Sequence, residues 1–361
     1  MWTDQALLAL LSIDIPIIQS PMAGAAGVEL AVAVSEAGGL GSLPCAMLSP
    51  QQIQDQASQL RKATTAPLHL NFFCHDAPGP AAHDHSRWLS RLSKFYGEYG
   101  LDSAQAQGHA GRAPFDDSLC EIAEEIKPEV ASFHFGLPRE DLVTRIKAAG
   151  AIVMSSATTV AEARWLAERG CDVIIAQGIE AGGHRGMFLS DDVHSQIGLF
   201  ALLPQIVDAV DVPVVAAGAI ASGRSIAAAM ALGASGVQIG TAYLLSDESR
   251  ISHLHRETLI ASASDHTAIT NLFSGRPARG LYNRLMREIG PLSADTPQFP
   301  LAGAALGPLK KAAEAQGKAD FSSLWSGQAG PLAQPGPAGE ITQHLAQEAL
   351  AVLSRLSGKN Q

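Results

Sequence analysis

One short stretch of the sequence presents a titratable ring where side-chain bulk is otherwise missing. Residues 178–186 read GIEAGGHRG, and His184 follows directly on Gly182 and Gly183. Adjacent glycines let a ligand lie against the backbone, and an imidazole, whose pKa is near neutral, can remove a proton from a bound substrate. A single histidine also occurs often as a structural group, so these residues alone leave a base and a structural role about equally open.

Two other stretches carry small residues of the kind that bind phosphate. Residues 218–225 read GAIASGRS, in which backbone N–H groups can converge and a helix that begins at Ser222 adds its dipole. Gly240 and Thr241 offer close backbone approach and a hydroxyl donor. Glycines in a loop without a ligand serve simply as turns, but two donor-rich loops together favour a bound phosphate.

These loops belong to a regular α/β pattern. Short β-rich apolar runs alternate with longer amphipathic runs, as in βα units around a parallel sheet. The eight predicted strands are residues 15–20, 40–43, 68–73, 129–136, 151–157, 173–178, 212–218 and 236–241. Eight units predict a (β/α)8 TIM barrel rather than an open Rossmann-type sheet, because PMAGAAG after the first strand lacks the G-x-G-x-x-G spacing of a dinucleotide site.

In such a barrel the active site forms at the C-terminal ends of the strands, so the motifs would share one rim. Asn71 and Gln177 end predicted strands, and SPMAG (residues 20–24) follows the first strand. Side-chain amides offer a donor and an acceptor together, which suits the pyrimidine edge of a flavin ring. Amides at strand ends often only satisfy nearby backbone, and it is their agreement at one rim that favours a ligand.

The chain is predicted to divide into three regions around this rim. These are a barrel domain at 1–245, a small helical lid after the last strand at 246–301, and a wrap and helix that pack back on the barrel at 302–361. Residues 75–118 are expected to leave the barrel as a loop and a helix. Within the lid, Arg276 and Arg279 would suit an anionic substrate tail, but salt bridges at helix ends are the favoured interpretation.

Composition excludes several classes of protein. The 361 residues carry 25 basic and 35 acidic side chains, a formal net charge of −10. Proteins that bind nucleic acid or anionic membranes are usually basic, so we expect neither partner. No run reaches the roughly 18 apolar residues that a membrane-spanning helix needs. Four scattered cysteines and an N-terminus without a basic region favour free thiols and a cytoplasmic protein.

Two pairs of histidines could suggest a metal site, and two charged residues lie close to His184 in the sequence. The histidine pairs at 83–85 and 253–255 lack a third ligand, so no metal is expected. Glu180 and Arg185, in the stretch that contains His184, are expected to be solvated.

Taken together, the motifs resemble a known family. QSPMAGAAG, LHLNFF, AQGIEAGGHRG, PVVAAGAIASGRS, GVQIGT and NLFSGRPARG follow the order found in the FMN-dependent nitronate monooxygenases, formerly called 2-nitropropane dioxygenases, along nearly the whole chain. The resemblance implies a TIM barrel that binds FMN noncovalently and oxidises alkyl nitronates, such as propionate 3-nitronate, with O₂ to a carbonyl compound and nitrite. It also implies that His184 is the catalytic base, that the substrate is a small nitronate or nitroalkane, and that the protein is a monomer or homodimer.

The resemblance further implies which residues bind FMN. They are Pro21, Met22, Ala23, Gly24, Asn71, Gln177, Gly182, Gly183, Gly218, Ala219, Gln238, Ile239, Gly240 and Thr241. Met22 and Asn71 would lie near the flavin ring, and Gln177 would hydrogen-bond it. The glycines at 182–183 would line the phosphate and ribityl path, the loops at 218–219 and 240–241 would bind the phosphate, and residues 238–239 would line the approach.

This sequence departs from the family in two places, and two other functions stay open. Ala219 follows Gly218 where many relatives have a second glycine, which keeps the backbone N–H. Phe299 lies in a region where related bacterial enzymes have tyrosines, which points to a substrate of different size or polarity. The alternatives are an FMN- and NAD(P)H-dependent reductase of the enoyl-acyl-carrier-protein or quinone type, whose loops resemble EAGGH, and a non-catalytic flavin-binding protein, against which His184 and the complete phosphate loops argue.

Overall fold

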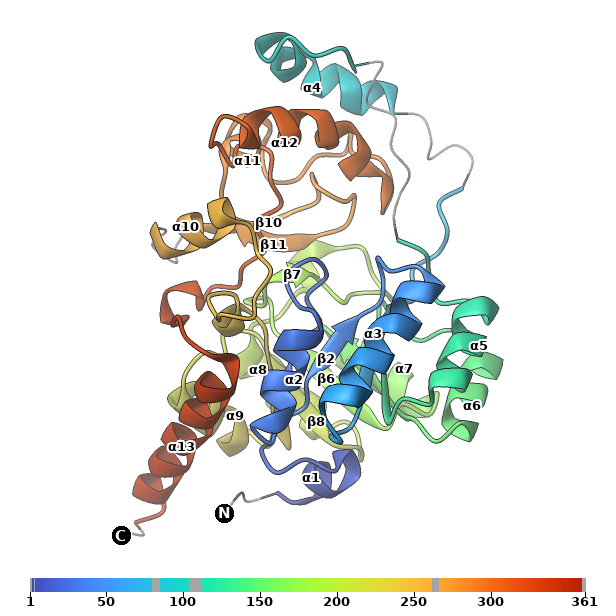
Figure 1. The fold of residues 1–361 in the computed structure, drawn as a ribbon, viewed down its shortest axis with the longest axis vertical. Helices are drawn as coiled ribbons and strands as arrows, with labels where there is room; N and C mark the ends of the chain where they lie inside the picture. The colour runs from blue at the N-terminus through green and yellow to red at the C-terminus, as the bar shows by residue number, and fades with distance from the viewer. Residues whose placement is uncertain (1, 3, 80–84, 104–111, 262–265, 359–361) are drawn as a thin grey trace.

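Eight parallel strands form the barrel that the sequence predicts. The computed structural model describes residues 2, 4–79, 85–103, 112–261 and 266–358. The strands are β1 (Ile17–Gln19), β2 (Ser42–Pro44), β3 (His69–Phe73), β4 (Val130–His134), β5 (Ile152–Ala157), β6 (Val173–Gln177), β8 (Val214–Ala217) and β9 (Gly236–Ile239). They pair in the order β1-β9-β8-β6-β5-β4-β3-β2. Gln19 N donates to Leu40 O at 2.8 Å just before β2, so the sheet curls into a nearly closed (β/α)8 barrel (Figure 1).

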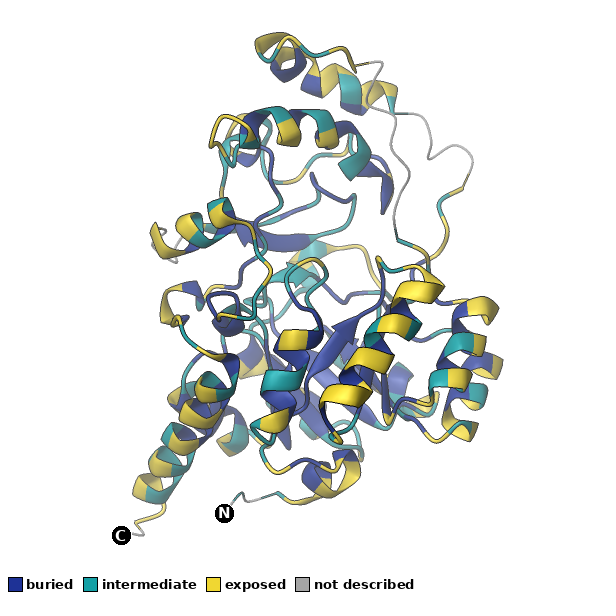
Figure 2. Ribbon diagram, in the orientation of Figure 1, coloured by how far each residue is buried: buried dark blue, intermediate teal, exposed yellow. Residues whose placement is uncertain are grey.

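Amphipathic helices cover the outside of the barrel. They are α2 (Val28–Glu36), α3 (Pro50–Ala63), α5 (Asp117–Ile126), α6 (Glu140–Ala148), α7 (Val160–Glu168), α8 (Leu199–Val207) and α9 (Gly223–Ala231). The start of α3 shows how the sequence sets a boundary: the Ser49 hydroxyl accepts from Gln52 N, and the Gln52 side chain accepts from Ser49 N. The helices turn buried residues toward the strands and exposed residues outward (Figure 2).

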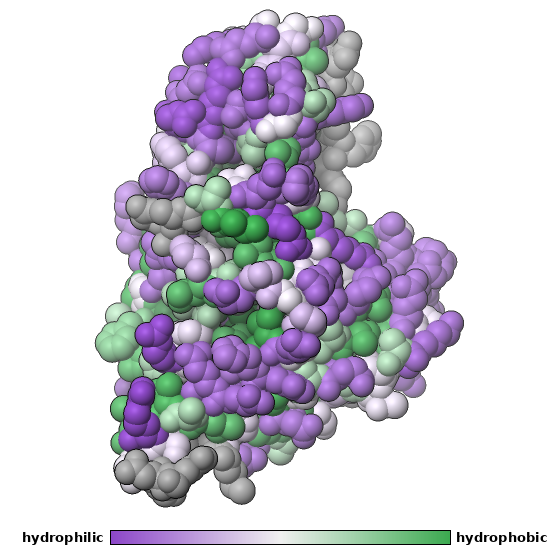
Figure 3. All heavy atoms as spheres, turned by 60° about the vertical axis from the view of Figure 1, so that its left-hand side comes forward, coloured by the Kyte–Doolittle hydropathy of each residue, from purple (hydrophilic) through white to green (hydrophobic). Residues whose placement is uncertain are grey.

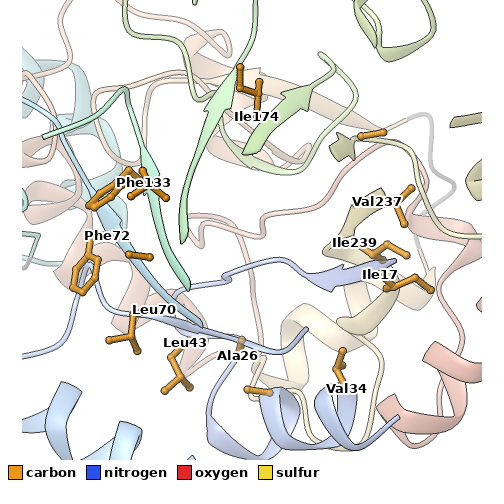
Figure 4. Packing of buried hydrophobic residues seen from close by; sticks show 14 of the residues in the cluster. Ile17, Ala26, Val34, Leu43, Leu70, Phe72, Phe133, Ile174, Val237 and Ile239 are labelled. Carbon is orange, nitrogen blue, oxygen red and sulfur yellow. The ribbon is translucent and has the colours of Figure 1, made fainter. Parts of the chain in front are cut away.

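Alternate strand residues build the core between strands and helices. On β9, Val237 and Ile239 pack into this core together with Ile17 of the neighbouring strand (Figure 4). Successive side chains of a strand point to opposite faces, so Gln238 between them faces the interior of the barrel. This alternation decides which residues of β9 can reach a ligand.

Two helices outside the βα alternation close the other sides of the barrel. α1 (Ala6–Leu11) lies across its N-terminal end, where Leu7 and Leu11 join a buried cluster with Ile18 and Val215 (Figure 1). The last long helix, α13 (Ala338–Leu356), packs against α9 and α2. The C-terminal ends of the strands are therefore the end that remains for a site.

A lid lies over that end. It contains α10 (His253–Ala261), β10 (Thr267–Thr270), β11 (Ala278–Leu281), α11 (Arg284–Ile289) and α12 (Gly307–Glu314). The lid is not purely helical, contrary to the expectation, because β10 and β11 form an antiparallel sheet with β7 (Gly183–His184). Strands this short give too few alternations to be recognised from a sequence. Since β7 comes from the GIEAGGHRG stretch, barrel and lid share this strand.

The excursion after β3 joins the lid as well. α4 (Ser86–Glu98) lies at the far end of the lid in Figure 1, where Trp88 Nε1 donates to Ala302 O at 3.2 Å and the Tyr96 hydroxyl donates to Ala305 O at 2.6 Å. Both aromatic side chains are buried there. A segment that precedes β4 thus packs with segments that follow β9, and the division of the chain at residues 245 and 301 stays a prediction.

The surface follows from this arrangement. On the face shown in Figure 3, the lid end is largely hydrophilic, and apolar side chains gather where the lid meets the barrel. In the ranges described above, no helix is long and apolar enough to cross a membrane. All four cysteines carry free thiols.

Candidate functional site

A cavity of about 500 Å³ lies at the C-terminal ends of the strands, between barrel and lid. Its volume is within the range of roughly 300 to 1,000 Å³ that is usual for small-molecule sites. The predicted residues that line it are Pro21, Met22, Ala23, Gly24, Asn71, Gln177, Gly182, Gly183, His184, Gly218, Ala219, Gln238, Gly240 and Thr241. The fold therefore brings together side chains that are more than 200 positions apart in the sequence.

Ile239 is the exception among the predicted residues. Its side chain is 1% exposed and packs in the core between β9 and the outer helices (Figure 4). Because neighbours in a strand face opposite ways, Gln238 takes the position in the cavity and Ile239 cannot. The side chain of Ile239 does not line the approach, contrary to the expectation.

His184 lies in the cavity on β7, the strand shared with the lid. Its Nε2 is 2.8 Å from Ser274 Oγ, and the rings of Phe299 and Trp325 have centroids 5.4 Å from its own. Burial among these rings, together with the nearby Arg112 guanidinium, holds the pKa of His184 well below the ordinary histidine value. The ring is therefore neutral at pH 7 and able to accept a proton.

Two side chains hold the backbone carbonyl of His184. His134 Nε2 donates to it at 3.1 Å and Gln177 Nε2 at 3.0 Å. Burial lowers the pKa of His134 to about 4, so its ring is neutral, and Nδ1 must then accept from Ser156 Oγ, 3.1 Å away. Gly186 N donates to Gln177 Oε1 at 2.8 Å. Both ends of the Gln177 amide are thus bonded to the stretch around His184, a role that its position at a strand end does not reveal.

The prediction that Arg185 and Glu180 are solvated was wrong. Arg185 is completely buried, and its guanidinium donates to the carbonyl oxygens of residues 177 and 178 at 2.7 and 2.8 Å and to Gln196 Oε1 at 2.9 Å. The Glu180 carboxylate accepts from Leu199 N at 3.0 Å at the start of α8, where an anion is favoured by the helix dipole. The two charges fasten the loop that presents His184.

The loop after β8 has the backbone of an anion site. Gly218 and Ala219 both have positive φ, +120° and +54°. Within the described part of the chain, the N–H groups of Ala219 and Ile220 have no hydrogen-bond acceptor. Consecutive free N–H groups in a sharp turn form a concavity that binds anions.

The N-terminus of α9 is already satisfied, contrary to the expectation that its dipole would serve a ligand. Gly223 N donates to Glu348 Oε2 of α13 at 2.6 Å. Ser222 and Ser225 form a capping box in which each hydroxyl accepts from the N–H group of the other residue. An anion at this end of the cavity would therefore be held by the loop rather than by the helix.

In the part of the chain that the structure describes, Arg276 and Arg279 form no helix-end salt bridge, although the sequence favoured that interpretation. Arg279 lies on β11 and donates to Ile179 O at 2.9 Å and Thr267 Oγ1 at 3.0 Å, which ties the lid sheet to the loop after β6. The Arg276 guanidinium carbon is 4.3 Å from the centre of the Phe135 ring. Neither is among the residues that line the cavity.

Arg112 does line the cavity and was missed by the sequence analysis. Its guanidinium carbon is 5.6 Å from the centre of the Phe299 ring. Phe299 in turn packs on Phe135, at 5.4 Å between ring centres, and Phe135 on Phe73 at 4.9 Å. The sequence around Arg112 has no hydrophobic periodicity, so it carries no signal of a site.

No metal site is found among the described residues. No group of three or more histidine, cysteine, aspartate or glutamate side chains there is placed to hold an ion. His253 pairs with Glu257 at 3.1 Å on α10, and His255 is buried. Of the other histidine motif, His83 and Asp84 lie outside the described residues.

The sequence is similar to known proteins along nearly its whole length. The sequence model of the nitronate monooxygenase family matches residues 4–348 of this chain. A nitronate monooxygenase of Paraburkholderia phytofirmans is 39% identical over 352 residues, 96% of each chain, and one of Pseudomonas aeruginosa is 40% identical over 342 residues, 94% of this chain and 97% of the relative.

Two solved structures have a similar fold along nearly the whole chain. A nitroalkane oxidase from Streptomyces ansochromogenes superposes with a TM-score of 0.88 at 37% identity, covering 97% of this chain and 99% of the other. FabK from Thermotoga maritima, at 27% identity, has a TM-score of 0.77 and full coverage of both chains. The chain belongs to the nitronate monooxygenase family, whose members are flavin-dependent oxidoreductases.

Proposed function

We propose that the protein is an FMN-dependent nitronate monooxygenase, which converts alkyl nitronates such as propionate 3-nitronate, with O₂, to a carbonyl compound and nitrite. The observation that carries this proposal is the cavity itself. A neutral His184, side-chain amides and an anion-binding loop meet in one space, in a chain 39% identical to a nitronate monooxygenase. The FMN-binding residues are those predicted above, without the side chain of Ile239.

The residues present fit FMN at both ends. Gln238 Oε1 is buried and has no hydrogen-bond partner in the described part of the chain, so this acceptor requires a ligand donor such as the N–H of a flavin ring. The free N–H groups at 219–220 would hold the phosphate. Bound FMN supplies the electron transfer between the nitronate and O₂.

The protein supplies the proton chemistry and the surroundings. A nitronate arrives deprotonated, whereas a neutral nitroalkane must first lose its α-proton, and His184 accepts it. Phe299 and Trp325 pack on the imidazole and exclude water from it. The bonds from His134 and Gln177 to the His184 carbonyl keep the base in place.

An anaerobic absorbance titration of the flavin-loaded protein tests the proposal. Propionate 3-nitronate is expected to change the absorbance of the oxidised flavin, and admission of O₂ is expected to release nitrite. NADH and NADPH, added separately, are expected to have no effect. Bleaching by a nicotinamide without a response to the nitronate would instead assign the protein to the reductases, the alternative that the likeness to FabK supports.

The anion loop gives a prediction of its own. A non-glycine residue in the left-handed conformation costs about 1–2 kcal/mol, and glycine costs about 0.5–1 kcal/mol in chain entropy. Ala219→Gly is therefore expected to raise the free energy of unfolding by about 0.5 kcal/mol and to leave the FMN content unchanged. Thermal unfolding and the ratio of flavin to protein check this, and a variant of lower stability or lower FMN content would contradict it.

A further inference from the structure

Arg112 is the one cation of the cavity without an anionic partner in the described part of the chain. Besides the histidines, the lining contains the cations Arg112, Arg250 and Lys310. Arg250 forms an ion pair with Glu29, and Lys310 Nζ lies 3.8 Å from Glu314 Oε1. No described carboxylate is within ion-pair distance of Arg112, and burial lowers its pKa with no opposing charge.

An unpaired guanidinium in this position calls for a ligand anion. Arg112 is half-buried, and its neighbour Phe299 offers a ring face rather than hydrogen-bond acceptors. A buried charge is costly unless it is paired and hydrogen-bonded. The planar fork of an arginine matches a carboxylate with two parallel hydrogen bonds, so a carboxylate is the ligand group that satisfies it best.

The ring of Phe299 connects Arg112 to the proposed base. Its centre is 5.6 Å from the Arg112 guanidinium carbon and 5.4 Å from the centre of the His184 ring. A ligand held by Arg112 at one end therefore presents its other end toward His184. Phe73 lines the cavity, and its ring centre is 6.2 Å from that of Phe299 behind the lining. An aromatic side chain of this kind suits a short alkyl chain.

We propose that Arg112 is the specificity-determining residue of this site, and that it binds a carboxylate at the far end of a short substrate chain. This inference rests on the proposed function, because it takes the reacting end of the substrate to be the nitronate beside His184. The overall negative charge of the protein makes a local cation necessary for a substrate with two negative charges.

A pair of substrates with and without the carboxylate tests the proposal. Propionate 3-nitronate and propyl-1-nitronate have the same chain length, and kcat/KM is measured for both by nitrite release. Arg112→Gln is expected to lower kcat/KM about 10- to 100-fold for propionate 3-nitronate, chiefly through KM, and no more than about threefold for propyl-1-nitronate. Equal losses on the two substrates would mean that Arg112 contacts the nitronate group or the fold, and would overturn the proposal.

Arg276→Gln is the matched control, since it removes the same charge from a residue that lies on an aromatic ring but outside the cavity lining. It is expected to change kcat/KM by the same factor for both substrates. If it discriminates against the carboxylate as strongly as Arg112→Gln, the selectivity comes from the general field of the site and the assignment to Arg112 fails.

A binding measurement separates this proposal from the proposed function. Propionate and 1-propanol are titrated into the flavin-loaded protein, and the change in flavin absorbance gives their dissociation constants. Arg112→Gln is expected to weaken propionate at least tenfold and 1-propanol no more than about twofold. This result would support the carboxylate site even if no nitrite were released from any substrate, whereas unchanged propionate binding would overturn it.

Discussion

His184→Asn is expected to lower kcat/KM for neutral nitroalkanes by about 100- to 10,000-fold, the range that a general base contributes. The asparagine amide cannot accept a proton, and it is too short to reach Ser274 Oγ, which lies 2.8 Å from His184 Nε2. The loss on nitronates is expected to be much smaller because they arrive deprotonated. Nitrite release from 1-nitropropane and from propyl-1-nitronate measures both effects.

The amount of bound FMN is the control for this variant and is expected to stay at the wild-type level. Equal losses of kcat/KM on the neutral and the anionic substrate would show that His184 is not the catalytic base. The pH profile gives a second check. Because burial and Arg112 lower the pKa of His184, the ring stays deprotonated as the pH falls, and kcat/KM for neutral nitroalkanes should begin to decline only well below pH 6.5.

Arg185→Met is expected to lower the free energy of unfolding by about 3 kcal/mol. The variant keeps most of the side-chain volume but removes a donor from the carbonyls of residues 177 and 178 and from the half-buried Gln196 side chain. Gly178 O keeps one other donor, Ala181 N, at 3.1 Å. Each unsatisfied buried group costs about 1–3 kcal/mol, and removal of a buried charge offsets part of that loss. In a chain of this size the change corresponds to a Tm that is lower by about 4 °C.

Arg224→Met is the matched control, because Arg224 is exposed on α9 and exposed substitutions usually change stability by less than about 0.5 kcal/mol. The Tm and the FMN content of both variants are measured by thermal unfolding and by flavin absorbance and compared with the wild type. A Tm for Arg185→Met within 1–2 °C of the wild type would show that the guanidinium does not fasten the loop.

The barrel could be predicted because its determinants are local. Each strand is a short apolar run with a helix after it. Because parallel strands of a barrel end at one rim, the sequence alone predicts that Asn71, Gln177 and His184 lie close together, and all three line the cavity. The alternation along β9 was also visible in the sequence, and applying it would have excluded the side chain of Ile239.

Other features depend on contacts that no local pattern reports. Arg185 is buried because carbonyls at the end of β6 require donors, and a lone arginine in a glycine-rich stretch gives no hint of that. The docking of α4 on the lid joins Trp88 to Ala302, more than 200 positions later. Arg112 acquires its environment only when Phe299 is placed beside it by the same long-range packing.

The strand shared by barrel and lid has a consequence for how molecules enter the enzyme. β7 follows the end of β6 and is paired with β11, with Ala278 opposite His184. A rigid-body opening of the lid would therefore have to break this pairing or move His184 away from the barrel. We therefore expect the lid to keep its position relative to the barrel during turnover. Substrate and product would then have to enter and leave beside the lid, through the side of the cavity, while the lid stays in place.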